Sequence, residues 1–101
     1  MAKQIIWSRR AQNDREEILK YWLKRNQSNE YSKKLNNLFK KAVKLVATHP
    51  EIGKPTDNLN ARIKVVRDYL IVYETDTDKI YILCIWDSRQ NPDKLKEILK
   101  K

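Results

Sequence analysis

Residues 62–92 (RIKVVRDYLIVYETDTDKIYILCIWDSRQNP) constrain the fold more than any other part of the chain. Runs rich in Val, Ile and Tyr around Ile63, at residues 69–74 and at residues 79–87 have the composition and length of β-strands. Only a few residues separate one run from the next, and the polar residues 76–78 form a turn between the last two. The segment therefore predicts three short strands in an antiparallel meander.

The last of these strands is apolar on both faces. Strict alternation predicts two sets of side chains, with Ile80, Ile82, Cys84 and Trp86 on one face and Tyr81, Leu83 and Ile85 on the other. A sheet covered by helices on one side only usually shows polar residues on its second face. We therefore expect that face to be covered either by a bound partner or by the C-terminal residues Leu95, Ile98 and Leu99.

Two long helices are predicted before the meander. A β-type run at residues 4–7 ends at Ser8, whose hydroxyl can cap a helix. Apolar residues at three- and four-residue steps predict helices from residue 9 to about 25 and from about 30 to 48. The predicted inward residues are Ala11, Ile18, Tyr21 and Trp22 in the first helix, and Tyr31, Leu35, Leu38, Phe39, Ala42, Val43, Leu45 and Val46 in the second.

The order of these elements predicts an α+β fold. The link between the helices is so short that we expect an N-terminal antiparallel helical hairpin, packed on a small antiparallel, mostly meander β-sheet. The 101 residues are 41% hydrophobic and 35% charged, which suits one modest core, so residues 1–101 are expected to form a single domain. No apolar run could cross a bilayer, and the first residues lack the apolar block of a signal peptide. We expect a cytoplasmic protein with no membrane association.

The inventory of reactive side chains excludes most cofactor chemistry. The single cysteine, Cys84, lies in an apolar strand and is interpreted as a buried thiol, and the single histidine, His49, as a helix-end residue. One Cys and one His cannot form a zinc site, which needs three or four ligands. Gly53 alone cannot build a phosphate-binding glycine loop, and in the turn that follows the second helix it is free to adopt positive φ. No metal and no small-molecule cofactor is predicted.

The chain is strongly basic, with 22 Lys and Arg against 13 Asp and Glu and a net charge of +9. Such an excess attracts nucleic acid and acidic proteins alike. On the second predicted helix, five lysines lie opposite the apolar face. They are Lys33, Lys34, Lys40, Lys41 and Lys44. A solvated face is the simpler interpretation of this pattern, and a binding surface is the alternative.

The order and spacing of several short motifs resemble the RelE/ParE superfamily of type II toxin–antitoxin toxins, and more closely its ParE-like branch. The motifs are Trp-Ser-x-x-Ala-x-x-Asp at residues 7–14, Pro-x-x-Gly at residues 50–53, Arg67 with Tyr69-x-x-x-Tyr73, and Trp-Asp-x-Arg-Gln-Asn-Pro at residues 86–92. The resemblance covers nearly the whole chain. It implies neutralisation by a cognate acidic antitoxin whose C-terminal segment wraps the toxin, which would explain the basic surface and the doubly apolar strand.

RelE-like members of this superfamily cleave messenger RNA on the ribosome. That reaction needs a base, cations that stabilise the phosphorane, and an acid for the leaving oxygen. In this chain the resemblance implies Arg62, Lys64 and Arg89 as catalytic candidates, with Tyr69 or Tyr73 as a substitute acid. Two positions depart from the nuclease pattern, because Leu70 stands where the second-strand arginine is expected and the terminal acid position falls near Leu95.

ParE-like members instead poison DNA gyrase by binding it, without a catalytic constellation of their own. The two leucines favour this activity, so we expect a toxin that inhibits gyrase rather than an enzyme. The predicted functional surface consists of Arg67, Asp87 and Arg89. For Asp87 and Arg89 the alternative is an ion pair that fixes the end of the last strand. Two other functions stay open, a ribosome-dependent endoribonuclease and a non-toxic basic nucleic-acid-binding module.

Overall fold

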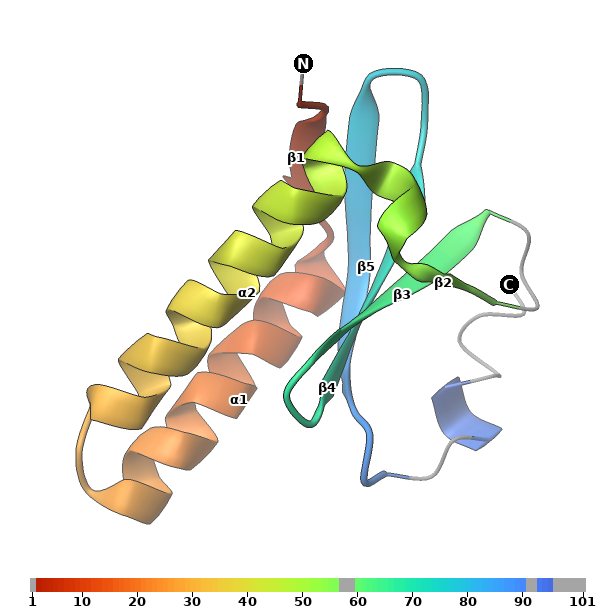
Figure 1. Ribbon diagram of the computed structural model, residues 1–101. Helices are drawn as coiled ribbons and strands as arrows, with labels where there is room; N and C mark the ends of the chain where they lie inside the picture. Colours follow the sequence, from red (N-terminus) through yellow and green to blue (C-terminus); the bar gives the residue numbers. More distant parts are fainter. Residues whose placement is uncertain (1, 57–59, 91–92, 96–101) are drawn as a thin grey trace.

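A computed structural model describes residues 2–56, 60–90 and 93–95 and shows a helical hairpin packed against a sheet (Figure 1). This arrangement confirms the predicted α+β fold. The elements before the meander are strand β1 (Gln4–Trp7), helix α1 (Arg9–Asn26), helix α2 (Glu30–Thr48) and the short 3-10 helix η1 (Pro50–Ile52). The later elements are the strands β2 (Lys54–Pro55), β3 (Ala61–Val66), β4 (Tyr69–Thr75) and β5 (Lys79–Asp87).

The sheet has the strand order β1-β5-β4-β3-β2. Strands β3, β4 and β5 form the predicted antiparallel meander, and β2 extends it by two residues. Strand β1 instead runs parallel to β5, with Gln4 opposite Lys79 and Trp7 opposite Ile82. A parallel pair needs a long crossover, and here the helices and the meander together supply it. Because β1 ends at Trp7, the part of β5 beyond Ile82 lies at the edge of the sheet.

The helix ends follow the residues that the sequence marks for them. The Ser8 side chain caps α1, where its hydroxyl oxygen accepts the Ala11 N–H at 3.0 Å. Gln27 ends α1 in the left-handed conformation with φ of 49°. His49 is the C-cap residue of α2 and donates its backbone N–H to the Leu45 carbonyl at 2.8 Å. The predicted roles of Ser8 as a cap and His49 as a helix-end residue are both confirmed.

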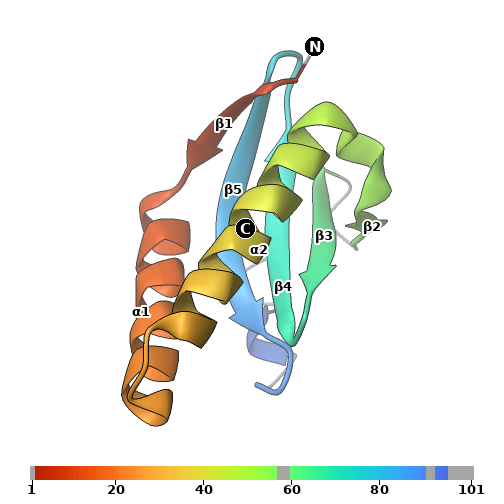
Figure 2. The same ribbon diagram turned by 60° about the vertical axis from the view of Figure 1, so that its left-hand side comes forward.

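The main core lies between the helices and one face of the sheet, which α2 crosses in Figure 2. Its fully buried side chains include Leu35, Phe39 and Val46 of α2. Burying a side chain of this size contributes about 1.5–3 kcal/mol. The prediction of a core position is wrong for two residues, because the side chain of Tyr21 is 49% exposed and that of Leu45 is 43% exposed. Both lie at the margin of their helix's apolar arc, where helical spacing does not decide burial.

Strand β5 contains a β-bulge that the alternation pattern does not predict. Val72 of β4 pairs with Cys84, and the next residue, Tyr73, pairs with Ile82. Leu83 is therefore an extra residue in β5 with no partner of its own in β4. A bulge of this kind shifts the alternation of side chains by one position.

The bulge changes which side chains of β5 face the helices. Ile80 and Ile82 pack in the main core, and so does Ile85 beyond the bulge. Cys84 and Trp86 pack in a second cluster on the opposite face of the sheet. The prediction that all four even-numbered residues share a face is therefore wrong, since it assumes an uninterrupted period of two.

The second cluster lies on the sheet face that the helices do not cover. Its buried members are Ala61, Val72, Cys84, Trp86 and Leu95. Leu95 is 7% exposed, so the C-terminal segment supplies part of the cover that the doubly apolar strand requires. Ile98 and Leu99, also expected there, lie outside the described residues. Cys84 is a free, fully buried thiol, and burial raises its pKa to about 11.

Candidate functional site

A pocket of about 500 Å³ lies between α1 and the end of β5. One wall is formed by α1, and the other by the start of β4, the end of β5 and the turn after it. The lining mixes charge with aromatic surface and includes Arg10, Asp14, Tyr21, Tyr69, Asp87 and Arg89. Two of the three residues predicted for a functional surface, Asp87 and Arg89, therefore lie together in this pocket.

Asp87 and Arg89 form a bidentate ion pair at the end of β5. The Arg89 Nη2 donates to Asp87 Oδ2 at 2.8 Å, and its Nε donates to Oδ1 at 3.0 Å. The backbone N–H of Arg89 donates to the same Oδ1 at 2.9 Å. These bonds from Arg89 hold the pKa of Asp87 below its ordinary value. The pair fixes the direction of a guanidinium group whose side chain is still 54% exposed.

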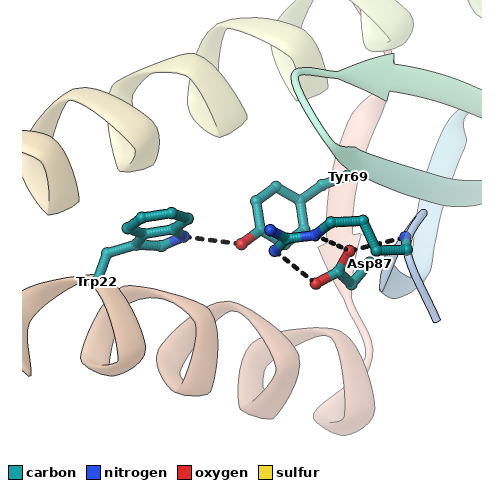
Figure 3. A network of polar contacts seen from close by, with 4 residues as sticks. Trp22, Tyr69 and Asp87 are labelled. Atoms are coloured by element: carbon teal, nitrogen blue, oxygen red, sulfur yellow. Dashed lines mark hydrogen bonds and ion pairs between the residues drawn. The ribbon is translucent and has the colours of Figure 1, made fainter. Parts of the chain in front are cut away.

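Tyr69 also lines the pocket and lies beside this ion pair (Figure 3). The Trp22 indole Nε1 donates to the Tyr69 hydroxyl oxygen at 2.8 Å, which joins α1 to the start of β4. The Tyr69 ring also meets the Phe39 ring edge-on, with centroids 5.7 Å apart. Burial raises the pKa of Tyr69, so its hydroxyl stays protonated at neutral pH. The hydroxyl can thus donate one hydrogen bond toward the pocket.

The motif at residues 7–14 attaches α1 to the bulged part of β5. The Ser8 hydroxyl donates to the Leu83 carbonyl at 2.9 Å. Ala11, three residues later, has no exposed surface. Because its side chain is only a methyl group, the helix can lie close to the strand there. After a further three residues, Asp14 Oδ2 accepts the Ile85 N–H at 3.0 Å. These bonds satisfy backbone groups of β5 just where β1 no longer pairs with it.

Asp14 is a half-buried carboxylate with an altered affinity for protons. Burial raises its pKa, and this outweighs the opposing effects of the Ile85 N–H and of Arg10, whose Nε lies 3.9 Å away. The sequence points to Asp14 only as part of a family motif, and it does not predict Arg10 or Glu17 as pocket residues. The sequence feature that could have indicated the pocket is the carboxylate of Asp14, because it lies on the same helix face as the apolar residues Ala11 and Ile18.

Arg67, the third predicted surface residue, does not line the pocket. It is exposed and occupies the two-residue turn between β3 and β4 with φ of 56°. Glycine is the usual residue at such a position, because a side chain at positive φ costs about 1–2 kcal/mol. The Ser88 N–H donates to the Asp68 carbonyl at 2.8 Å, which links this turn to the turn that carries Arg89.

Arg62 and Tyr73, two of the ribonuclease candidates, hold the chain around η1. The Tyr73 hydroxyl donates to the Pro50 carbonyl at 2.7 Å and accepts the Gly53 N–H at 3.0 Å. Arg62 Nη1 donates to the carbonyl oxygens of Gly53 at 2.8 Å and Glu51 at 3.1 Å. Tyr73 has no exposed surface, and burial raises the pKa of its hydroxyl.

The five ribonuclease candidates are not brought together. Arg62 pairs with Tyr73 in the sheet, whereas Tyr69 pairs with Asp87 next to Arg89. Tyr73 comes four positions after Tyr69 along β4, which places the two groups about 13 Å apart. Lys64 lies between them on β3, opposite Ile71. The structure thus gathers Tyr69 and Arg89 in the pocket and leaves the other three outside its lining.

The two leucines that depart from the nuclease pattern lie in the second cluster, on the sheet face opposite the helices. Leu70 packs against this cluster as a partly buried residue, and Leu95 is one of its buried members. Their positions are therefore occupied by apolar packing, which offers neither a cation nor a proton donor.

Within residues 2–56, 60–90 and 93–95, no three His, Cys, Asp or Glu side chains are grouped so as to hold a metal ion. In the same part of the chain, no helix combines the length and the apolar character that a membrane crossing needs.

Comparison with known proteins gives a matching family model and several similar solved structures. The family model described as "ParE toxin of type II toxin-antitoxin system, parDE" matches residues 5–92. A solved structure described as "Chromosomal ParDE TA system from P. aeruginosa" has a TM-score of 0.71 with this chain. That likeness covers 83% of this chain and 94% of the other at 18% identity, so it concerns the fold. No curated protein sequence matches this one.

Proposed function

The chain belongs to the ParE toxin family of type II toxin–antitoxin systems, and from this premise we propose that it inhibits DNA gyrase by binding it. The observation that carries the choice of a binding inhibitor over a nuclease is the packing of Leu70 and Leu95. Both positions, where a ribonuclease of the superfamily would hold polar catalysts, belong to an apolar cluster. A toxin that acts by binding needs no reactive groups there.

The bonding of the other ribonuclease candidates also supports an inhibitor that acts by binding. Arg62 donates to two backbone carbonyls, and the buried Tyr73 hydroxyl has both a donor and an acceptor partner within the fold. Groups engaged in this way are poorly placed to stabilise a phosphorane or to protonate a leaving oxygen. Their positions favour a role in stabilising the turn after α2.

We place the contact with gyrase at the pocket between α1 and β5. Arg89 is oriented by Asp87 yet half exposed, and the exposed ring of Tyr21 lines the same pocket. Arginine and tyrosine are the residues that most often dominate the binding energy of protein interfaces. Arg67 extends this surface, because its turn is bonded to the turn that carries Arg89.

The proposed neutralising partner is a cognate antitoxin with an acidic segment. The family description names a two-component toxin–antitoxin system, and the net charge of +9 suits a negatively charged partner. A neighbouring reading frame that encodes a small DNA-binding protein with an acidic tail would be the first candidate for this antitoxin.

The direct test is DNA supercoiling by purified gyrase with the purified chain added. We expect inhibition at micromolar concentrations, together with trapped gyrase–DNA cleavage complexes. The control is messenger RNA cleavage in a translation extract, which should stay at background. Normal supercoiling at these concentrations would refute the proposal, and ribosome-dependent cleavage in the extract would point to the ribonuclease alternative instead.

A further inference from the structure

The outer side of α2 carries a stripe of five exposed lysines, Lys33, Lys34, Lys40, Lys41 and Lys44. At about 100° per residue they fall within roughly 120° of the helix circumference, opposite the buried Leu35, Phe39 and Val46. The stripe is about 16 Å long, given a rise of 1.5 Å per residue. Figure 2 shows α2 crossing the front of the sheet. The buried residues of α2 pack toward that sheet, so the stripe on the opposite side of the helix faces away from it.

The charge of this lysine stripe is not neutralised. Glu30 is the only acidic residue in the 19 residues of α2, and no lysine of the stripe forms an ion pair with any residue that the structure describes. Helix α1 is different, because Asp14, Glu16 and Glu17 are interspersed among its basic residues and Arg10 pairs with Asp14. The positive field is therefore concentrated along one rigid line.

The stripe lacks the features of a protein-binding surface or a single-strand-binding surface. Protein interfaces have an apolar core enriched in aromatic residues, and single strands stack their bases on exposed aromatic rings. Among the described residues of α2, the large apolar side chain that is exposed is Leu45, and it lies at the margin of the stripe. The nearby Tyr31 ring is instead partly buried against Trp22, with ring centroids 4.8 Å apart.

A duplex backbone matches these properties. Double-stranded DNA presents one charge per 1.7 Å of its axis, so a duplex lying along the stripe offers about nine phosphates to five lysines. We propose that the lysine stripe of α2 binds the phosphate backbone of duplex DNA without reading its base sequence. This surface is separate from the pocket between α1 and β5, and the binding requires no gyrase.

The test is fluorescence anisotropy with the full chain and a labelled duplex of about 20 base pairs, several times the roughly five that the stripe spans. We expect the logarithm of the binding constant to fall linearly with the logarithm of salt concentration, with a slope of about −4.5 for five neutralised phosphates. A second duplex of unrelated sequence should bind equally well. A slope near zero, or no binding at low salt, would overturn the inference.

Charge-matched variants locate the surface. The double substitution Lys40→Gln/Lys44→Gln should reduce the slope to about −2.7 and weaken binding at every salt concentration. The control Lys54→Gln/Lys94→Gln removes the same charge from exposed positions outside the stripe. The control should retain the full slope, and circular dichroism should show that both variants are folded. Equal losses in the two variants would mean that net charge alone attracts DNA, which would also overturn the inference.

The remaining arms separate other polyanions. Single-stranded DNA, duplex RNA and poly-glutamate are added as competitors to the complex with duplex DNA. We expect duplex DNA to be the strongest ligand, and stronger competition by any of the three would overturn the inference. A chain that inhibits gyrase but does not bind duplex DNA would refute this inference alone. A chain that binds duplex DNA but leaves gyrase active would refute only the proposed function.

Discussion

At the scale of single residues, the pocket depends on side chains whose positions are fixed by hydrogen bonds to the fold. Asp87 orients the Arg89 guanidinium, and Trp22 holds the Tyr69 hydroxyl. Asp14 accepts a backbone N–H of β5 while it lines the same pocket. Such oriented groups lose little freedom on binding, so a partner can use them efficiently.

The first prediction concerns Arg89. We expect Arg89→Ala to raise the concentration needed for gyrase inhibition about tenfold or more, as for an arginine at the centre of an interface. Its ion pair with Asp87 is exposed, so the thermal unfolding midpoint should hardly change. The matched control is Arg25→Ala, an exposed arginine of α1 outside the pocket. If both variants inhibit gyrase like the parent chain, Arg89 is not part of the binding surface.

The second prediction concerns Asp14 and its pH dependence. Asp14→Ala should cost about 1–3 kcal/mol in the free energy of unfolding, because it leaves the Ile85 N–H without its acceptor. Asp14→Asn keeps an oxygen at that position and should cost much less. The two variants are compared by denaturant unfolding at neutral pH, and equal losses would argue against the hydrogen bond.

The sign of the pH effect follows from the raised pKa of Asp14. The folded chain binds a proton at this carboxyl more tightly than the unfolded chain, so the contribution of Asp14 to stability is greatest below its unfolded pKa. It declines as pH rises through the higher folded pKa. The stability of Asp14→Asn relative to the parent chain should therefore increase with pH over this range. A difference that is independent of pH would contradict the raised pKa.

At the scale of elements, the bulge in β5 and the turn after α2 determine how the layers meet. The bulge directs Ile85 toward the helices and Trp86 toward the second cluster. Near the other end of the meander, the Tyr73 hydroxyl bonds both Pro50 and Gly53. Gly53 has φ of −70°, so it does not use the positive φ that glycine is free to adopt. Glycine is needed instead because a side chain would meet the Tyr73 ring.

The third prediction tests this close approach. A Cβ at position 53 would lie 2.8 Å from Tyr73 Cε1, so Gly53→Ala should cost about 1–3 kcal/mol in the free energy of unfolding. Tyr73→Phe should cost a similar amount, because the buried Gly53 N–H loses its acceptor. The double variant should cost less than the sum, since removing the hydroxyl relieves part of the overlap. Additive losses in denaturant unfolding would contradict this account.

At the scale of the whole molecule, the protein is strongly basic, and the two faces of its sheet are covered by different parts of the chain. The hairpin packs on one face, whereas the second face is covered in part by Leu95. The proposed partners then use different surfaces, with gyrase at the pocket between α1 and β5 and duplex DNA at the lysine stripe of α2. The net charge of +9 acts on both encounters.

The fourth prediction concerns the encounter with the proposed antitoxin. Electrostatic attraction between a chain of charge +9 and an acidic partner should raise their association rate constant at low salt. We expect stopped-flow measurements to show that this rate constant falls at least about tenfold from low to high ionic strength. The dissociation rate constant should change much less. An association rate constant that is insensitive to salt would show that charge does not guide this pairing.

The sequence by itself determined the elements and their order. Helical spacing located α1 and α2, and β-type runs located β3, β4 and β5, because these patterns depend on residues close together in the chain. The family motifs, and the departures from the nuclease pattern at Leu70 and Leu95, could also be identified from the sequence. Asp87 and Arg89 were identified as neighbours because only Ser88 lies between them in the chain.

Only the tertiary structure decided how distant residues meet. The parallel pairing of β1 with β5 and the bulge at Leu83 depend on backbone groups far apart in sequence, to which the Ser8 and Asp14 side chains bond. The bulge reassigned the faces of β5, and a hydrogen bond joined Trp22 to Tyr69 across 47 positions of the chain. Local patterns carry no information on such contacts, because their energy appears only when the layers have packed.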